Sequence, residues 1–322
     1  MQDVLIHSPF PRETTQGNTI TADRLESVLV KNGISVAMSV VHYSGQSARC
    51  LVALNAWRSA ADVAEYRAVN PDGKVIVIIT GSDINHEELA DADSPTRRTM
   101  ASADALVMLH KQEFHKLTDE LQAKCHVIHP SVTLADDVVH ETPHREEFVA
   151  IIAGNLRPVK NPSLAVAACR KLPLTSRVSV SAYGSASGDI ETVVSKASDE
   201  LANYQWHGMV SHEELLPKMQ GADILLNVSI GEGGANAICE AMTMGLPVIA
   251  TDIGGNKGML GEDYLGCFPS EDAEALAVLL KKVSNDPVFY QTLKSQVTER
   301  AELFTYKVES QLWIDLVQRI LS

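Results

Sequence analysis

The sequence predicts an α/β protein of two doubly wound, Rossmann-like domains that face each other across a cleft. Its 322 residues, 45% of them hydrophobic and 21% charged, suit a globular chain longer than one typical domain. Short β-branched runs alternate with amphipathic stretches, which is typical of a parallel sheet covered by helices. The alternation occurs twice, on either side of a polar segment at 133–147 that we interpret as a linker.

The first domain is expected over residues 1–140. Apolar, β-branched runs predict its strands, and helical periodicity predicts the helices between them. The expected strands are 4–7, 35–41, 50–54, 75–80, 105–109 and 126–129, and the expected helices are 21–31, 60–69 and 111–121.

The second domain is expected over residues 141–304, where the same alternation restarts. We expect the last helix, 305–322, to return to the first domain. The closing stretch 291–321 has helical periodicity, with Trp313, Leu316, Val317 and Ile320 on one face. The expected strands are 148–153, 177–183, 204–207, 224–227, 247–250 and 266–268, and the expected helices are 163–171, 213–219, 236–244 and 273–283.

Charge and cysteine usage narrow the class of protein. A formal net charge of −14 argues against nucleic acid or an anionic membrane as the main partner. No apolar run approaches the ~20 residues that cross a bilayer. The five cysteines are widely spaced, with no histidine at zinc spacing, as expected for reduced side chains. The sequence therefore predicts a cytoplasmic protein that needs no metal or other cofactor.

The strongest functional pattern is GEGGANAICEAMTMG at 231–245. Seven residues separate Glu232 from Glu240, and the two glycines after Glu232 let the backbone approach a ligand. Asn236 suits the N-cap of a helix. Free amides at a helix start favour a diphosphate, and the two carboxylates can accept hydrogen bonds from sugar and ribose hydroxyls. A capped helix with solvated glutamates is the alternative, and the double glycine favours the ligand site.

A second pattern is GNLRPVKNP at 154–162, directly after the first strand of the second domain. Lys160 and Arg157 place cations at the carboxyl end of a parallel strand, where ligands bind in doubly wound folds. They can neutralise a diphosphate there. The alternative is a surface loop with ordinary cations.

The 231–245 pattern resembles the E-x7-E motif of a large family of retaining GT-B glycosyltransferases. The resemblance implies that Glu232 contacts the donor sugar and Glu240 the ribose. The segment 154–162 is similar to the family's G-R-L-x-x-x-K-G segment, which assigns Lys160 to the diphosphate. Asn155 stands at the arginine position, so Arg157 is a candidate for the missing charge. The implied catalytic set is Lys160, Arg157 and Glu232, and the donor-binding set is Glu232, Gly233, Gly234, Ala235, Asn236, Glu240, Asn155, Lys160 and Gly17.

Two loops of the first domain also match family positions. The loop TQGNTITADR at 15–24 corresponds to one that covers donor phosphates and acceptor in the family, which implicates Gly17 and Asn18. The segment ITGSDI at 79–84 stands where the family has an H-G-x-D-like pattern. Thr80 replaces the histidine, and Asp83 is either a helix cap or a group on the acceptor side.

Several segments together are similar to the selenosugar synthases of selenoneine biosynthesis. They are GNTITADR, LVALNAWRSA, ITGSDI, NLRPVKNP, EGGAN and GNKGMLGEDYLGCFP, and they cover nearly the whole chain. This resemblance implies transfer of N-acetylglucosamine from its UDP-sugar to selenophosphate. Arg24 and Arg58 are cations at matching positions, although each also suits a surface salt bridge. The implied acceptor-binding set is Asn18, Arg24, Arg58, Thr80 and Asp83.

Three other functions stay open at this point. They are a GT-B glycosyltransferase with a hydroxyl or thiol acceptor, a nucleotide-sugar epimerase, and a non-catalytic module that binds nucleotide sugars. Intact Glu232, Glu240 and Lys160 argue against the non-catalytic module. An NAD enzyme is disfavoured because no G-x-G-x-x-G follows the first strand.

Overall fold

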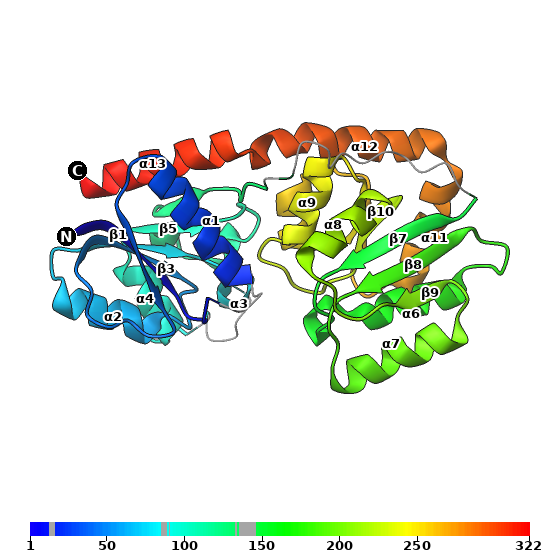
Figure 1. The fold of residues 1–322 in the computed structure, drawn as a ribbon, viewed down its shortest axis with the longest axis horizontal. Coiled ribbons are helices and arrows are strands. Elements are labelled where there is room, and N and C mark those ends of the chain that lie inside the picture. Colours follow the sequence, from blue (N-terminus) through cyan, green and yellow to red (C-terminus); the bar gives the residue numbers. More distant parts are fainter. Residues whose placement is uncertain (13–16, 85–88, 90, 133, 135–145) are drawn as a thin grey trace. The chain divides into compact units, whose positions relative to one another are not determined.

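The computed structural model describes residues 1–12, 17–84, 89, 91–132, 134 and 146–322, which form two compact units (Figure 1). Unit 1 contains Met1–Ser131 and Leu303–Ser322, and unit 2 contains Val132–Glu302. Within the described residues, each unit has one six-stranded sheet whose strand pairs are all parallel. The predicted pair of doubly wound α/β domains is confirmed.

The sheet of unit 1 has the strand order β2-β1-β3-β4-β5-β6. Successive residues of a strand point to opposite faces, so each central strand contributes to two cores. Leu51 belongs to the core on one face, while Cys50 and Val52 belong to the core on the other. The strands are β1 (Gln2–Ser8), β2 (Val36–Val40), β3 (Ala48–Leu54), β4 (Lys74–Ile78), β5 (Ala105–Met108) and β6 (Cys125–Val127).

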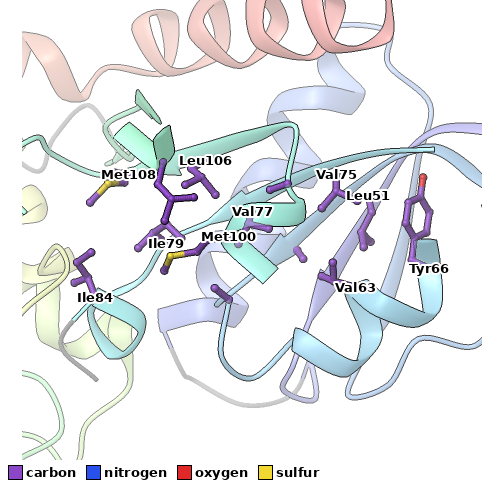
Figure 2. Close-up of a cluster of buried hydrophobic side chains, with 14 of the residues drawn as sticks. Leu51, Val63, Tyr66, Val75, Val77, Ile79, Ile84, Met100, Leu106 and Met108 are labelled. Carbon is purple, nitrogen blue, oxygen red and sulfur yellow. The ribbon is translucent and has the colours of Figure 1, made fainter. Parts of the chain in front are cut away.

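One face of this sheet is covered by α2 (Ala60–Val69) and α4 (Pro95–Ser102). Figure 2 shows Val63 of α2 and Met100 of α4 among the strand residues of this core, which include Leu51. Each such side chain contributes about 1.5–3 kcal/mol when it is fully buried. Shorter elements of unit 1 are α3 (Gly81–Ile84), η2 (Phe114–Lys116) and α5 (Asp119–Gln122).

The opposite face is covered by α1 (Gly17–Lys31) and α13 (Tyr306–Leu321). The predicted apolar face of the last helix is the face that packs: Trp313, Leu316 and Val317 are buried, and Ile320 is partly buried against them. The last helix of the chain therefore completes the core of unit 1.

A buried carboxylate also holds α13 in place. Glu309 is 2% exposed, and its Oε1 lies 3.1 Å from Nε of Arg24 on α1. Its Oε2 accepts hydrogen bonds from the backbone N–H of Ser131, at 2.8 Å, and from the Ser131 hydroxyl. A buried charge needs such partners, because desolvation without them is costly.

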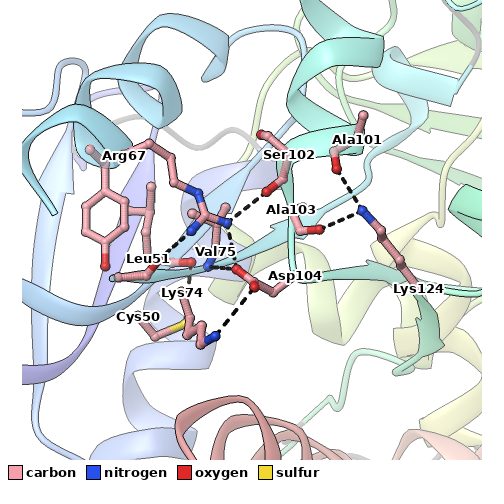
Figure 3. A network of polar contacts seen from close by, with 12 residues as sticks. Cys50, Leu51, Arg67, Lys74, Val75, Ala101, Ser102, Ala103, Asp104 and Lys124 are labelled. Carbon is pink, nitrogen blue, oxygen red and sulfur yellow. Dashed lines mark hydrogen bonds and ion pairs between the residues drawn. The ribbon is translucent and has the colours of Figure 1, made fainter. Parts of the chain in front are cut away.

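Loops at the amino ends of β4 and β5 are tied together by Arg67 (Figure 3). Its guanidinium donates to the carbonyl oxygens of Gly73 and Ser102 and pairs with Asp104 at 2.7 Å. Asp104 in turn accepts a 2.8 Å hydrogen bond from the backbone N–H of Val75. This network secures the amino edge of the sheet, opposite the carboxyl edge from which the predicted site loops emerge.

The sheet of unit 2 has the order β12-β11-β10-β7-β8-β9, with helices on both faces (Figure 1). The strands are β7 (Phe148–Ala153), β8 (Val178–Tyr183), β9 (Tyr204–Trp206), β10 (Ile224–Asn227), β11 (Val248–Thr251) and β12 (Cys267–Phe268). The helices and turns are η3 (Pro158–Lys160), α6 (Pro162–Lys171), α7 (Gly188–Glu200), α8 (His212–Gln220), α9 (Asn236–Met244), α10 (Gly254–Leu260), α11 (Ala273–Asn285) and α12 (Pro287–Ala301). The short turn η4 (Glu302–Phe304) crosses the boundary between the two units.

Two predicted helices are interrupted in the structure. The stretch 111–121 contains only the short η2 and α5, because Leu117 and Thr118 between them have extended backbones with ψ of 152° and 158°. The stretch 291–321 breaks at Thr305, where ψ is 148°. The hydroxyl of Thr305 accepts a backbone hydrogen bond and so caps the start of α13.

The substitution Arg24→Gln is expected to lower the free energy of unfolding of unit 1 by about 1.5–3 kcal/mol, since it removes a charged hydrogen bond from buried Glu309. The measurement is urea unfolding followed by tryptophan fluorescence in a Trp206→Phe background. In that background the two remaining tryptophans, Trp57 and Trp313, both report on unit 1.

Arg49→Gln is the matched control for this measurement. Arg49 pairs with Asp3, their side chains being 45% and 34% exposed, and it donates to the carbonyl oxygen of Leu321. An exposed pair contributes about 0–1 kcal/mol. If Arg24→Gln lost no more stability than this control, the buried pair would not be holding α13.

Candidate functional site

Apart from Gly17 in unit 1, the predicted donor residues follow β7 and β10, two neighbouring strands of unit 2. Because these strands are parallel, the loops that follow them emerge at one edge of the sheet. The loop after β7 carries Lys160, and the loop after β10 carries Glu232. A 2.9 Å hydrogen bond from the backbone N–H of Ile230 to the carbonyl of Val159 joins the two loops.

The structure brings Lys160 and Glu232 into direct contact. Nζ of Lys160 lies 2.5 Å from Oε1 of Glu232, and the hydroxyl of Ser229 donates to the same oxygen at 2.6 Å. Glu232 is 8% exposed, so its carboxylate depends on these donors. The cation and the carboxylate that sequence analysis assigned to the diphosphate and the sugar are thus neighbours.

Lys160 is positioned by the short turn η3. Pro158 suits the first position of the turn, where a fixed φ is favourable and the missing N–H costs nothing. Asn161 ends η3 in the left-handed region, with φ of 45°, and leads into α6. Arg157 precedes the turn with an exposed side chain and forms no ion pair with the described carboxylates. Its catalytic role stays a prediction.

Asn155, at the arginine position of the motif, connects two loops. Its Oδ1 accepts a 2.8 Å hydrogen bond from the hydroxyl of Ser185, which follows β8. A Cβ at Gly184 would lie 2.1 Å from the carbonyl oxygen of Gly154, so only glycine fits this crossing. The donor-binding role of Asn155 stays a prediction, and its contacts are those of a residue that fixes the loop of Lys160.

The amino end of α9 lies close to Glu232 in the sequence and has no side-chain cap. The prediction that Asn236 is the N-cap is wrong: Asn236 is the first helical residue, because the extended residue before it is Ala235. Alanine offers no acceptor, so no side chain satisfies the first backbone N–H groups of the helix. Gly233 and Gly234 lead into this end, and Gly234 has φ of 152°. Such an end favours an anion.

The first turn of α10, which follows β11, packs directly against the backbone of Glu232. A Cβ at Gly255 would lie 2.1 Å from the carbonyl oxygen of Glu232, so a larger residue would displace this turn. The hydroxyl of Thr251 donates to the carbonyl of Ser229, and Nδ2 of Asn256 donates to the Thr251 hydroxyl at 2.9 Å. Gly255, Thr251 and Asn256 therefore fix the shape of the loop that carries Glu232.

Glu240, the second glutamate of the motif, pairs with His212. Nε2 of His212, at the start of α8, lies 2.9 Å from Oε1 of Glu240. The hydrogen bond to Glu240 raises the pKa of His212, against a smaller lowering by burial. Sequence reasoning missed His212, because its partner is 28 residues away and no spacing pattern connects the two.

Three predicted acceptor residues of unit 1 follow neighbouring strands: Arg58 follows β3, and Thr80 and Asp83 follow β4. Nδ2 of Asn55 donates to the Thr80 hydroxyl at 2.8 Å, which joins the loops. The backbone N–H groups of Thr80 and Trp57 donate to Asp83, at 2.8 Å and 3.3 Å. Burial raises the pKa of Asp83 to about 6, although these hydrogen bonds lower it. Asp83 thus fixes the loop that precedes Arg58.

Arg58 presents its charge at the surface of this loop cluster. Its guanidinium lies 5.1 Å from the ring centre of Phe10 and 4.7 Å from that of Trp57, a cation–π arrangement that orients it. The side chain is exposed, and no carboxylate of the described residues pairs with it. Arg58 is therefore available to an anionic ligand.

The other predicted acceptor residues lie on α1. Gly17 and Asn18 begin this helix, whereas 13–16, the residues before it, lie outside the described residues. Arg24 is already engaged by buried Glu309. The roles of these residues at a ligand site stay predictions.

In the residues that the structure describes, no cluster of three or more His, Cys, Asp or Glu side chains could hold a metal ion. None of the described helices combines the length and the apolarity that crossing a membrane requires.

Solved structures with the same architecture include two proteins that align over nearly the whole chain. Sucrose-phosphate synthase from Thermosynechococcus elongatus has a TM-score of 0.82 and 16% identity, with 99% of each chain covered. HepE from Anabaena, in complex with UDP and glucose, has a TM-score of 0.76 and 14% identity, with 99% of this chain and 100% of that chain covered. These likenesses show that the fold is GT-B.

Similar curated proteins are D-inositol 3-phosphate glycosyltransferases. The protein from Nocardioides sp. is 23% identical over 280 residues, which cover 74% of this chain and 60% of that protein. The protein from Mycolicibacterium smegmatis is 28% identical over 187 residues, which cover 53% of this chain and 41% of that protein. The chain thus spans about three fifths or less of the length of these relatives.

The family described as "Glycosyl transferases group 1" matches residues 136–302, slightly more than half of the chain. The matched region contains the Lys160–Glu232 pair, the uncapped start of α9 and Glu240. The chain belongs to the glycosyl transferases group 1 family.

Proposed function

We propose that the chain is a glycosyltransferase that moves a sugar, N-acetylglucosamine, from a UDP-sugar to selenophosphate and so forms a selenosugar for selenoneine biosynthesis. The observation that carries the proposal is the Lys160–Glu232 pair beside the uncapped amino end of α9. Family membership and structural neighbours that bind UDP support the donor class. The segments shared with selenosugar synthases support the acceptor.

The donor diphosphate is assigned to Lys160 and the amides that lead into α9. When the bond between the anomeric carbon and the UDP oxygen breaks, the electron pair leaves with UDP and charge develops on the diphosphate. Donors already in place stabilise that charge without reorganising. A lysine ammonium has three N–H groups, so Lys160 can keep its contact with Glu232 and still reach a phosphate oxygen. The proposal therefore requires no metal or other cofactor.

The hydroxyls of the donor are assigned to the two glutamates. Glu232 accepts from the sugar, and Glu240 accepts from the ribose. The raised pKa of His212 favours the protonated ring, which pairs with Glu240 and fixes the position of this side chain.

Selenophosphate is assigned to the loop cluster of Arg58. A selenium anion is a strong nucleophile, so it forms the new bond to the anomeric carbon without a general base. Water then cleaves the Se–P bond, releasing phosphate and a selenol. Five unpaired cysteines agree with a cytoplasmic enzyme, in a compartment that keeps thiols reduced.

A phosphorylated hydroxyl acceptor is the second candidate, since the similar curated proteins are named D-inositol 3-phosphate glycosyltransferases. Arg58 suits the phosphate of either acceptor. The test incubates the protein with UDP-N-acetylglucosamine alone, with selenophosphate and with inositol phosphate, and measures UDP and products by mass spectrometry. A selenium-containing sugar supports the first proposal, and an inositol glycoside would replace it with the second. Epimerised donor without acceptor would indicate an epimerase.

Lys160→Ala is expected to lower kcat on the order of 10²-fold, because it removes a group that stabilises charge in the transition state. Steady-state UDP release at saturating donor is the measurement. Lys171→Ala is the matched control, because Lys171 is a half-exposed lysine of unit 2 that pairs with Glu274 away from the site. Unchanged kinetics in a folded Lys160→Ala protein would remove Lys160 from the mechanism.

Glu240→Ala is expected to weaken UDP binding by about 1–3 kcal/mol, through loss of hydrogen bonds from the ribose to a charged acceptor. Glu232→Ala is expected to weaken binding of the UDP-sugar much more than binding of UDP. Calorimetric titration of both variants with both ligands separates the two roles. Equal effects of each substitution on both ligands would contradict the assignment.

Arg58→Gln is expected to raise the KM for selenophosphate about 10- to 100-fold while UDP affinity stays nearly constant, because a charge-assisted contact to the acceptor is lost. Initial rates against selenophosphate concentration provide the measurement. Arg24→Gln is the comparison, since the sequence predicts the same effect for it although Glu309 engages Arg24. A raised KM with Arg24→Gln and not with Arg58→Gln would move the acceptor pocket to α1.

A further inference from the structure

The two oxygens of Glu232 are held very differently. Oε1 receives Nζ of Lys160 at 2.5 Å and the Ser229 hydroxyl at 2.6 Å, with Nδ2 of Asn227 at 3.5 Å. Among the described residues, no side chain donates to Oε2. Oε2 is not fully buried, so it retains contact with solvent. One oxygen thus faces the protein, and the other is open to a ligand.

Ser229 is the most buried of the three donors to Oε1. It is 2% exposed, and its backbone N–H donates to Oδ1 of Asn227 at 3.1 Å. Its carbonyl accepts from the hydroxyl of Thr251, which in turn accepts from Asn256, and both of these residues are fully buried. This chain of hydrogen bonds runs from α10 through the end of β11 to Glu232. By contrast, Lys160 has a long side chain that is partly exposed.

We propose that Ser229 is a positioning residue that holds Oε1 of Glu232 against the protein and thereby directs Oε2 at a hydroxyl of the donor sugar. This inference rests on the proposed function, because it refines how Glu232 meets the UDP-sugar. In that proposal Lys160 divides its three N–H groups between Glu232 and the diphosphate, whereas the single hydroxyl hydrogen of Ser229 serves Glu232 alone. The hydroxyl of Ser229 orients the carboxylate of Glu232 and takes no part in breaking the bond between the sugar and UDP.

The test compares the affinities of UDP and of UDP-N-acetylglucosamine for the parent protein and for Ser229→Ala, Ser229→Cys and Ser229→Thr. Ser229→Ala is expected to lower the affinity for the UDP-sugar about tenfold and to leave the affinity for UDP unchanged, because the lost hydrogen bond to Glu232 affects only contacts with the sugar. Ser229→Cys, nearly the same shape with a weak donor, is expected to behave like alanine. Ser229→Thr keeps the hydroxyl and is expected to restore most of the affinity.

Ser284→Ala is the matched control, because the hydroxyl of this buried serine of α11 donates to the carbonyl of Lys281 and accepts from Nδ2 of Asn285. Parent-like UDP-sugar affinity in Ser229→Ala, or equal weakening of both ligands, would overturn the positioning role. If alanine prevents folding, Ser229→Cys decides by the same two criteria. A parent protein that binds UDP and no UDP-sugar would overturn the proposed function itself, a result visible before any variant is compared.

Discussion

Glu232 of unit 2 is only 8% exposed, and a buried carboxylate is stable only where hydrogen-bond donors surround it. Lys160 reaches it from the loop after β7, and Ser229 reaches it from its own loop. Because Gly255 has no side chain, the segment that follows β11 can pack against the backbone of Glu232. The three loops are therefore mutually fixed, and the site is organised before any ligand arrives.

Two arginines of unit 1, both predicted to bind the acceptor, have different surroundings in the structure. Arg24 faces a carboxylate that is 2% exposed, and its charge serves the attachment of α13. Arg58 lies between two aromatic rings at the surface, where no described carboxylate neutralises it. The family resemblance assigned both to the acceptor as cations at matching positions. The difference comes from a glutamate 285 residues away along the chain, which no local pattern connects to Arg24.

The fold was largely predictable because β-branched runs and helical periodicity are local signals. The interruptions at Leu117 and Thr305 were not, since each depends on an extended residue within an otherwise helical pattern. Two motifs assigned Lys160 and Glu232 to one donor site, and their direct contact is a finding of the structure. His212 and Ser229 were missed, because each acts through a partner in a loop or helix whose position only the folded sheet determines. Asn236 was misassigned by one residue, the usual uncertainty at a helix end.

The membership of α13 in unit 1 has a consequence for synthesis of the protein. Unit 2 is contiguous in the sequence, whereas unit 1 needs residues from both sides of it. On the ribosome, the strands of unit 1 therefore emerge before unit 2, and α1 can cover only part of the sheet face that α13 completes, while unit 2 can complete its own core. Trp313, Leu316 and Val317 cover that face only after the final helix has been released. Unit 1 therefore completes its core only after unit 2 has been synthesised.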